Sequence, residues 1–299
     1  MKSSVKAKSM LAMSFVIWGS IGVFVQMIPL NSGLIAFDRS IVGMLFLLVV
    51  KLCMKSKISF QKLKSSFGLL CVNGALLGIN WILLFEAYKF TSVATGTICY
   101  NLGPMIVVLL SPIFFKEHLS VVKILCVLVS LFGIVCVSGI FSEQGAGESD
   151  VIGVTLGVMA AVVYAATVII NKRVQDVDVM DKAIVQFASS TVVMFVYSLF
   201  VTDVSELSFD VKTIVLLIAV GVVHTGIAYT VYFKSLPDVT SQNVAIFAYI
   251  DPVVAVILSV TVLNESINEY VVIGAVCVIV SALVSELYDN QQKKHLLQG

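Results

Sequence analysis

The sequence predicts an all-α polytopic membrane protein with ten transmembrane helices, arranged as two inverted five-helix repeats. Three observations predict this fold: an apolar composition, ten apolar stretches of spanning length, and an internal repeat. Hydrophobic residues make up 59% of the chain and charged residues 12%, and the mean hydropathy is +1.04. Because a soluble domain carries about 25% charged residues, we expect the excess apolar surface to face lipid.

Each predicted span is a run of about 20 mainly apolar residues, the length of helix that crosses ~30 Å of hydrocarbon. The first run follows Lys2, Lys6 and Lys8, as in a signal peptide, but it is longer than such a segment and no A-x-A cleavage site follows it. We therefore count it as a transmembrane helix. The spans are expected near residues 9–28, 34–52, 67–88, 93–115, 120–140, 152–171, 182–201, 213–233, 239–262 and 270–288.

The polar segments between the spans are short, and their charge differs between the two sides. Sixteen of the 19 Lys and Arg residues fall on the side that carries both termini, whereas Glu148, Asp150 and Glu269 fall on the other. Cytoplasmic loops carry the excess of Lys and Arg in membrane proteins. We therefore expect a multi-pass protein of the cell (inner or plasma) membrane with both termini in the cytoplasm.

Several classes of function are disfavoured by the sequence. A net charge of +1 provides no basic face for nucleic acid. The six cysteines show no metal-binding spacing and are expected to be free, since most lie in apolar runs. The three histidines are scattered, and neither HExxH nor GxxxxGK[ST] occurs. We expect no enzymatic activity, no cofactor, no metal and no direct use of ATP.

The two halves of the chain align at a shift of 148 residues. The matched pairs are Gly78 with Gly226, Trp81 with Tyr229, Phe85 with Phe233, Pro104 with Pro252, and Glu117 with Glu265. Because each half has an odd number of helices, the halves run in opposite directions through the bilayer, as in alternating-access transporters. We expect repeats at 1–141 and 152–288, an outer linker at 142–151 and a cytoplasmic tail at 289–299.

Two pairs of glycines are spaced for close helix contact. Gly74 with Gly78, and Gly153 with Gly157, form small-xxx-small motifs. They suit packing inside the bundle and equally suit the face of a homodimer, and the sequence leaves both uses open.

Short motifs along the chain carry a resemblance to a known family, and part of them is repeated in the second half. They are Trp18-Gly19, Arg39, the block from Ala87 to Ala94, Pro104, Lys116-Glu117, Pro252, Asn264-Glu265 and Gly274-Ala275. In these motifs the chain resembles the drug/metabolite transporter superfamily, specifically its EamA-type ten-helix members. The resemblance implies transport of amino acids, amines, drugs or other metabolites. The chain departs from the family pattern at Asp251, where an apolar residue is common, and the repeat counterpart of Arg39 is Phe187.

Ionisable residues at mid-membrane are candidate functional groups, because each costs about 2.5–3.5 kcal/mol on insertion scales. Asp251 lies halfway along the ninth span beside Pro252, which opens the helix, as Pro104 does in the fourth span. We expect Asp251 to bind a proton or cation, with His224 in the eighth span as its candidate relay partner. The structural alternatives are a carboxyl group bonded to the broken backbone and a histidine satisfied by hydrogen bonds.

Asp38 and Arg39 lie near the outer end of the second span. Neighbouring helical residues point ~100° apart, so these two are not expected to pair. Glu86, near the outer end of the third span, is the predicted partner of Arg39 in an ion pair at the outer gate. The functional alternative is that Arg39 binds a substrate carboxylate or other anion.

Aromatic and amide side chains at depth are expected to line a substrate cavity. Trp81 and Tyr229 occupy equivalent repeat positions, as expected for two walls of one cavity, and aromatic faces suit apolar groups or cationic amines. Ordinary core packing and interface belts are the alternative. The predicted cavity residues are Trp18, Asn80, Trp81, Tyr100, Asn101, Tyr164, Tyr229 and Tyr249. Glu117 and Glu265 are expected to cap neighbouring helices.

The sequence thus predicts a secondary transporter of a small polar or amphipathic metabolite, such as an amino acid, amine or drug. Proton-coupled efflux by alternating access is the first choice, and uptake of a similar solute is the close alternative. A membrane scaffold or receptor is less favoured, because long loops and tails for partners are lacking. The expected partners are the substrate, protons and the lipid bilayer.

Overall fold

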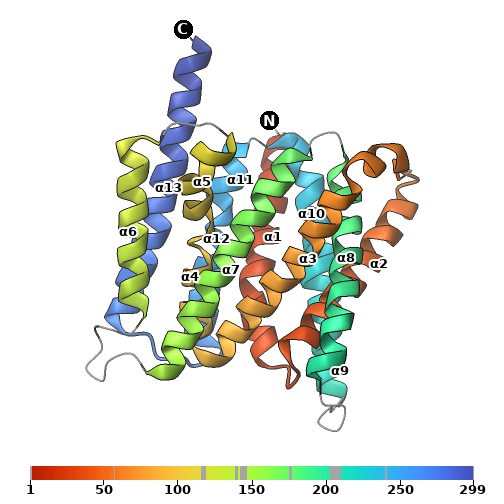
Figure 1. Cartoon of the computed structure of the whole chain (residues 1–299), viewed down its shortest axis with the longest axis horizontal. Helices are drawn as coiled ribbons and strands as arrows, with labels where there is room; N and C mark the ends of the chain where they lie inside the picture. Colours follow the sequence, from red (N-terminus) through yellow and green to blue (C-terminus); the bar gives the residue numbers. More distant parts are fainter. Residues whose placement is uncertain are drawn as a thin grey trace.

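The computed structural model of the protein describes residues 2–56, 58–115, 119–138, 141, 147–174, 177–202, 210–239 and 241–298. Over these ranges the chain forms helices and no strands (Figure 1). Eight of the described helices are long and apolar enough to cross a membrane, and two shorter apolar helices cover Val121–Val137 and Ile246–Thr261. The predicted all-α fold with ten spans is confirmed.

Most spans are single helices, and three are composite. The first five spans are α1 (Lys2–Gln26), α2 (Ser32–Cys53), α3 (Phe60–Phe90), α4 with α5 (Val93–Tyr100 and Gly103–Phe115) and α6 (Val121–Val137). The second five are α7 (Glu148–Arg173), α8 (Val179–Val201), α9 with η2 and α10 (Val211–Ile218, Ala219–Ile227 and Ala228–Ser235), α11 with α12 (Ser241–Ala248 and Ile250–Thr261) and α13 (Glu269–Gln298). A short helical turn, η3 (Leu236–Asp238), follows α10.

Both chain ends lie at the same end of the bundle (Figure 1). This end also carries the loop after α2, with Lys55, and the last turn of α7, with Lys172 and Arg173, so we call it the lysine-rich end. The opposite end carries Glu148 and Asp210, and we call it the acidic end.

Polar side chains fix where several helices begin. Asn31, Ser92 and Ser120 each accept a hydrogen bond from a backbone N–H three residues later at the start of α2, α4 and α6. Asp210 does the same for α9, and its hydrogen bonds with Thr213 hold its pKa below the ordinary value. These caps place each helix start at one end of the bundle.

The fourth and ninth spans are broken at the same point of the repeat. α4 ends at Tyr100 and α11 ends at Ala248, which are 148 residues apart. The next residues, Asn101 and Tyr249, have nearly the same backbone angles: φ −69° with ψ −1°, and φ −75° with ψ −3°. A proline follows three residues later in both spans and cannot continue the hydrogen-bond pattern of the preceding helix.

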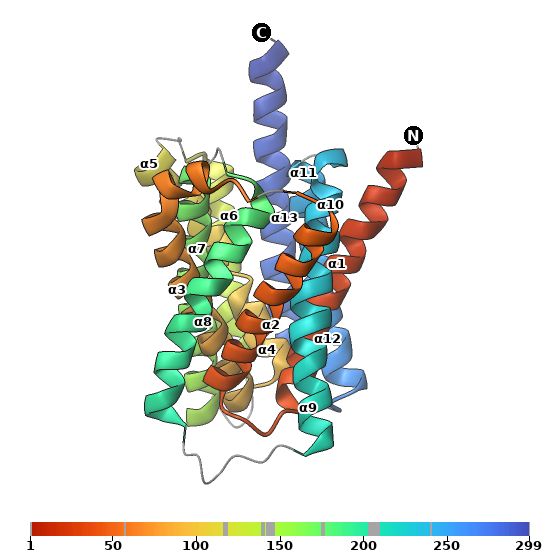
Figure 2. The same ribbon diagram turned by 90° about the vertical axis from the view of Figure 1, so that its right-hand side faces the viewer.

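The packing of the two repeats is also duplicated. A Cβ at Gly78 of α3 would overlap Met194 of α8, and a Cβ at Gly226 of η2 would overlap Phe46 of α2. These two contacts are related by the same 148-residue shift. We call α3, α7 and α8 the first bundle, and α1, α2, η2 and α10 the second bundle, because each set packs together. Figure 2 shows α3, α7 and α8 on one side and α1 and α10 on the other.

The glycine pairs that the sequence left open are used within the chain. A Cβ at Gly74 would overlap the backbone of Gln186 in α8, and one at Gly153 would lie 2.6 Å from Thr91. Gly157 approaches Cys99 in the same way. These small residues therefore let α3 and α7 approach their neighbours closely.

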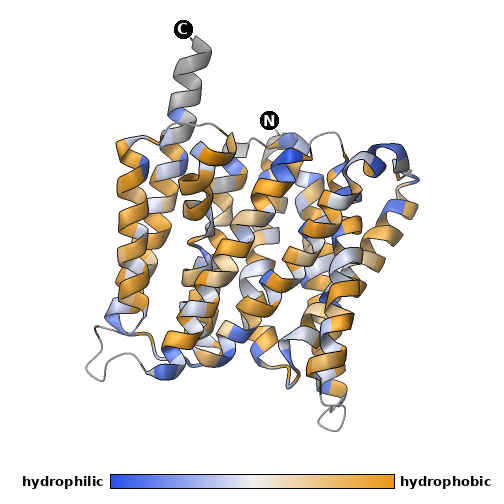
Figure 3. Cartoon of the chain, in the orientation of Figure 1, coloured by the Kyte–Doolittle hydropathy of each residue, from blue (hydrophilic) through white to orange (hydrophobic). Residues whose placement is uncertain are grey.

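The sides of the bundle are apolar and its ends are polar (Figure 3). Large apolar side chains such as Ile113, Val192 and Phe200 are exposed on the sides, with exposed fractions of 73%, 63% and 84%. Exposure of this kind matches lipid as the surrounding solvent, and the chain is a multi-pass membrane protein.

Two glycines of α3 test the close packing of α3 on α8. Gly74→Ala should destabilise the protein by about 1–3 kcal/mol, because the new methyl group overlaps the backbone of Gln186. Gly68→Ala is the matched control in the same helix, since no atom lies within 4 Å of its Cβ position. It should be neutral or stabilising by about 0.5–1 kcal/mol, from helix propensity. Thermal unfolding in detergent measures both, and equal melting temperatures for the two variants would contradict this packing.

Candidate functional site

Arg39 is buried at the centre of the bundle, with only 5% of its surface exposed. Its Cζ lies 4.1 Å from the ring centroid of Trp81 and 5.9 Å from that of Phe85. Its Nε–H donates to the hydroxyl of Thr225 at 3.0 Å. No other acceptor for the guanidinium is found among the described residues, so its four Nη–H bonds are left available. A guanidinium held flat and with its fork free is suited to bind a carboxylate.

The predicted ion pair between Arg39 and Glu86 is wrong. Glu86 accepts instead from Lys89 at 3.0 Å, one turn away on the same helix and partly exposed. The reason is direction: Arg39 points at the face of α3 that carries Trp81, whereas Glu86 lies on the α3 surface at the acidic end. Arg39 therefore faces the interior, and the alternative, in which it binds a substrate carboxylate or other anion, stays a prediction.

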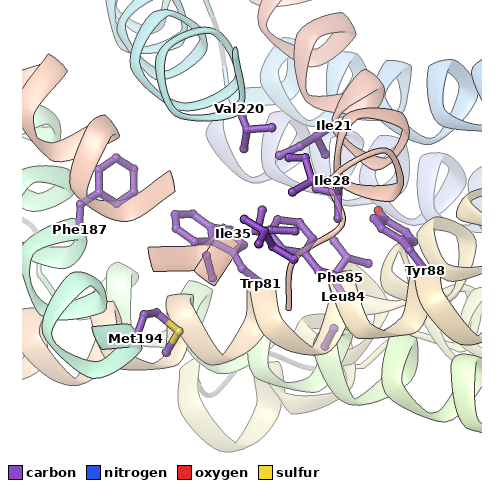
Figure 4. Packing of buried hydrophobic residues seen from close by; sticks show 14 of the residues in the cluster. Ile21, Ile28, Ile35, Trp81, Leu84, Phe85, Tyr88, Phe187, Met194 and Val220 are labelled. Atoms are coloured by element: carbon purple, nitrogen blue, oxygen red, sulfur yellow. The ribbon is translucent and has the colours of Figure 1, made fainter. Parts of the chain in front are cut away.

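Four residues at two pairs of repeat-equivalent positions meet around this guanidinium. They are Arg39 with its counterpart Phe187, and Trp81 with its counterpart Tyr229. The Phe187 ring lies 5.8 Å from Trp81 and 5.2 Å from Tyr229. Figure 4 shows Phe187 facing Trp81 across the cluster, with Phe85 beside Trp81. From the sequence, Phe187 is identified only as the uncharged counterpart of Arg39. The 148-residue repeat shift, which relates Phe187 to Arg39, is the signal that could have predicted its place beside Trp81 and Tyr229.

The Trp18-Gly19 motif holds α1 between two neighbours. Trp18 donates from its indole N–H to the carbonyl of His224 at 3.0 Å. A Cβ at Gly19 would lie 2.5 Å from the carbonyl oxygen of Asp251, so only glycine lets α1 lie this close to the start of α12. The indole of Trp18 also packs 4.9 Å from the ring of Tyr229. α1 therefore connects η2 with the broken ninth span.

Asp251 lies in the first turn of α12, directly after the break in the ninth span. Among the described residues its carboxyl group has neither a hydrogen bond nor an ion pair. Arg39 and Tyr100 lie within electrostatic range of it but do not contact it. The N-terminal end of a helix stabilises a carboxylate. Asp251 is thus a free acidic group opposite a basic one.

Several aromatic residues near these charges retain accessible surface deep inside the bundle. Tyr100 and Tyr164 pack edge to face at 5.4 Å and are partly accessible, as are Trp18 and Tyr229. These four aromatic residues come from α1, α4, α7 and α10. The shared cavity that they are predicted to line stays a prediction.

The direct contact predicted between His224 and Asp251 is not formed. The His224 ring forms hydrogen bonds with the hydroxyl of Ser20 at 3.0 Å and with the carbonyl of Ala219 at 3.2 Å. Ser20 and its neighbour Gly19 point to different sides of α1, one toward His224 and the other toward Asp251. α1 therefore lies between the two groups. Thr225, which lies in the wide helical turns of η2, donates from its hydroxyl to the carbonyl of Val220 and accepts from Arg39.

Three other predicted cavity residues have structural partners. Asn80 is 1% exposed and donates to the carbonyl of Ala160 at 2.6 Å, so it joins α3 to α7. Asn101 donates to the carbonyl of Thr97 at the break after α4. Tyr249 is 9% exposed and packs in the apolar cluster around α4, α6 and α13. Asn80 is therefore removed from the site, and the other two mark the breaks beside Pro104 and Pro252.

Asp38 and Glu265 are two further acidic residues in or near the spans. One carboxylate oxygen of Asp38 is buried without a hydrogen-bond partner in the described part of the chain. Glu265 accepts from the backbone N–H of Val93 at 3.0 and 3.1 Å, so its predicted role as a cap of a neighbouring helix is confirmed. Glu117, its repeat counterpart, lies outside the described residues. The described His, Cys, Asp and Glu residues form no group of three or more that could hold a metal ion.

The comparisons with known proteins are consistent over the whole chain. The sequence pattern of the EamA-like transporter family matches it twice, at residues 6–139 and 151–287. An uncharacterized transporter of Bacillus subtilis (strain 168), YxxF, is 26% identical over 270 residues, covering 90% of this chain and 85% of its own. An uncharacterized transporter of Archaeoglobus fulgidus is 22% identical over 297 residues, covering 96% of this chain and 99% of its own. A crystal structure with 16% identity has a TM-score of 0.64 over 94% of this chain and 98% of its own, which supports the fold alone.

Two threonines of the eighth span test how Arg39 is held. Thr225→Val should destabilise the protein by about 1–3 kcal/mol, because the buried Nε–H of Arg39 loses its acceptor. Thr230→Val is the matched control, since the buried Thr230 hydroxyl has no partner among the residues that the structure describes, and its loss should cost little. Thermal unfolding in detergent compares the two. A Thr230 variant as unstable as the Thr225 variant would contradict the assignment.

Proposed function

Because the chain belongs to the EamA-like transporter family, we propose that this membrane transporter carries a small zwitterionic metabolite, such as an amino acid, in exchange for protons. The observation that carries the proposal is the pair of opposite, available charges inside the bundle. In the part of the chain that the structure describes, the guanidinium fork of Arg39 has no acceptor and the carboxylate of Asp251 has no partner. A substrate with a carboxylate at one end and an ammonium group at the other satisfies both.

The surroundings of the two charges support a substrate of this kind. An ionised group away from water is stable only when it is paired. Arg39 and Asp251 do not touch, so a bound zwitterion lying between them would supply the missing partner of each. Trp18, Tyr100 and Tyr229 offer aromatic faces to the ammonium group and to the rest of the substrate.

Coupling to protons follows from competition for Asp251. The carboxylate can hold either a proton or the ammonium group of the substrate, but not both. Proton binding and substrate binding therefore oppose one another, which is the thermodynamic condition for exchange. We assign the coupling role to Asp251 alone, because His224 is bonded to Ser20 on the far side of α1.

The movement that we propose is rocking of the first bundle against the second around this site. The breaks beside Pro104 and Pro252 lie at equivalent points of the two repeats and are the proposed hinges. We propose that the repeats comprise residues 1–141 and 152–288, and that the lysine-rich end faces the cytoplasm of a cell (inner or plasma) membrane. Residues 142–146 of the linker lie outside the described ranges.

Efflux is the proposed direction, and uptake by the same site is the alternative. Both use the same binding chemistry, and the orientation of the proton gradient distinguishes them. In proteoliposomes, efflux by exchange requires substrate to move against the direction of the protons, whereas proton-coupled uptake moves both together. A scaffold or receptor would bind the solute without any flux.

Binding specificity tests the substrate class. Among L-amino acids, their methyl esters and their N-acetyl derivatives, only parent amino acids should raise the melting temperature in detergent, because each derivative lacks one of the two charges. If a derivative raises the melting temperature as much as its parent amino acid does, the site does not recognise the charge that the derivative lacks, and that part of the proposal would be wrong. Arg39→Gln should abolish the response, whereas Lys89→Gln at the acidic end should leave it unchanged.

The response should also depend on pH. Stabilisation by the amino acid should weaken as the pH falls, because protons displace its ammonium group from Asp251. Stabilisation that strengthens at low pH would indicate that the substrate and the proton bind together, and exchange would be wrong.

Flux in proteoliposomes tests the coupling residue. With a labelled amino acid, a pH gradient should drive accumulation by the unchanged protein. Asp251→Asn should reduce this accumulation by a factor of ten or more, because the amide can neither bind nor release the coupling proton. The free energy of binding that proton is several kcal/mol, and 1.36 kcal/mol already corresponds to a factor of ten. Glu269→Gln, a change at an exposed carboxyl group, serves as the control. Full accumulation by Asp251→Asn would overturn the assignment.

A further inference from the structure

A buried ion pair joins α2 to α8 at the lysine-rich end of the bundle. Lys51, in the last turn of α2, contacts the carboxylate of Asp181, in the first turn of α8. Their side chains are only 5% and 1% exposed. The other oxygen of Asp181 accepts from the backbone N–H of Ser59, just before α3. Lys51 and Asp181 are 130 positions apart, so no sequence pattern indicates that they meet.

The position of the pair gives it mechanical importance. α2 belongs to the second bundle and α8 to the first, so the pair crosses the interface between the two bodies that are proposed to rock. Midway along this interface the hydroxyls of Ser40 and Ser190 hydrogen-bond at 2.8 Å. The contacts at the two ends of the α2–α8 interface therefore lie on either side of the Ser40–Ser190 hydrogen bond.

Among the described residues, the contacts at the opposite end of the same interface join uncharged side chains. There the side chain of Asn31 donates to the hydroxyl of Thr202 at 2.8 Å, and Gly33 packs against the ring of Tyr197. The repeat counterparts of Lys51 and Asp181 are Leu199 and Gly33, which cannot form an ion pair. The two ends of the α2–α8 interface thus differ in chemistry although the repeats share a fold.

We propose that Lys51 and Asp181 form the latch of the gate at the lysine-rich end, which must separate each time the central site opens to that side. The pair is stable while it is enclosed, because each charge neutralises the other and each also sits at the favourable end of its helix dipole. Opening admits water, which solvates the two charges separately. The latch therefore favours closure at this end without preventing opening. This proposal depends on transport by rocking, but on neither the substrate nor the proton.

Thiol labelling tests the latch without any substrate. In a protein with its six native cysteines replaced, Asn101→Cys places a single reporter at the break after α4. In the latch variant Lys51→Gln/Asp181→Asn, an impermeant maleimide applied at the lysine-rich end should label the reporter on the order of tenfold faster, a typical coupling between two states. Labelling from the acidic end should slow down.

The ion pair between Lys89 and Glu86 is the matched control. Lys89→Gln/Glu86→Gln removes a pair of opposite charges that is partly exposed and lies within one helix, so it should change labelling from neither side. Unchanged labelling in the latch variant would overturn the proposal. Faster labelling from both sides would also overturn it, because this indicates general loosening rather than a shift of the gate.

Cross-linking provides a measurement that does not depend on removing the charges. Lys51→Cys/Asp181→Cys, joined by a short bifunctional maleimide, should lose labelling of the reporter from the lysine-rich end while keeping it from the acidic end. Untethered protein with the same two changes is the control. Labelling from the lysine-rich end that continues at the untethered rate would show that the gate opens with α2 and α8 held together, and the latch would be wrong. Flux of amino acids does not enter either result, so failure of the latch and failure of the proposed substrate are distinguishable.

Discussion

The central constraint on this protein is the burial of the Arg39 guanidinium among apolar helices. A buried charge must be stacked, hydrogen-bonded or paired, and each neighbouring element contributes to this. α3 provides the face of Trp81, and η2 provides the hydroxyl of Thr225. The Thr225 hydroxyl is itself held by the carbonyl of Val220 within η2, and Trp18 holds α1 against η2. The remaining capacity of the guanidinium is left for a ligand.

The inverted repeat places two equivalent half-sites together, but the two halves supply opposite charges. Arg39 comes from the first repeat and Asp251 from the second, and their counterparts are Phe187 and Gly103, which carry no charge. The fold is therefore nearly symmetric while the electrostatics are not. A site of this kind orients a ligand that has two different ends. The same distinction between shape and charge recurs at the α2–α8 interface, where, among the described residues, the ion pair lies at the lysine-rich end and uncharged side chains meet at the other.

Different residues provide the close packing and the polar contacts between the helices of this bundle. Glycines at the helix crossings, such as Gly74 and Gly226, allow the helix backbones to approach closely. This close packing matters because the hydrophobic effect does not drive helices together in lipid. Polar side chains then join the helices: Asn80 bonds α3 to α7, and Ser40 bonds α2 to α8. The broken spans are tolerated because their free backbone groups lie inside the protein rather than against lipid. Close approach and polar bonding between the helices thus come from different sets of residues.

Composition and periodicity alone determined the ten spans, the two broken helices and the central place of Trp81 and Tyr229. These features follow from the need to cover ~30 Å of hydrocarbon and from a repeat that is visible in the chain. Partners across helices were decided only by the tertiary structure. Arg39 faces Trp81 rather than Glu86, His224 meets Ser20 rather than Asp251, and Lys51 finds Asp181. The reason is geometric: which residues meet depends on the rotation of each helix about its axis, and small differences in crossing angle or one wide turn change that rotation without leaving a pattern in the sequence.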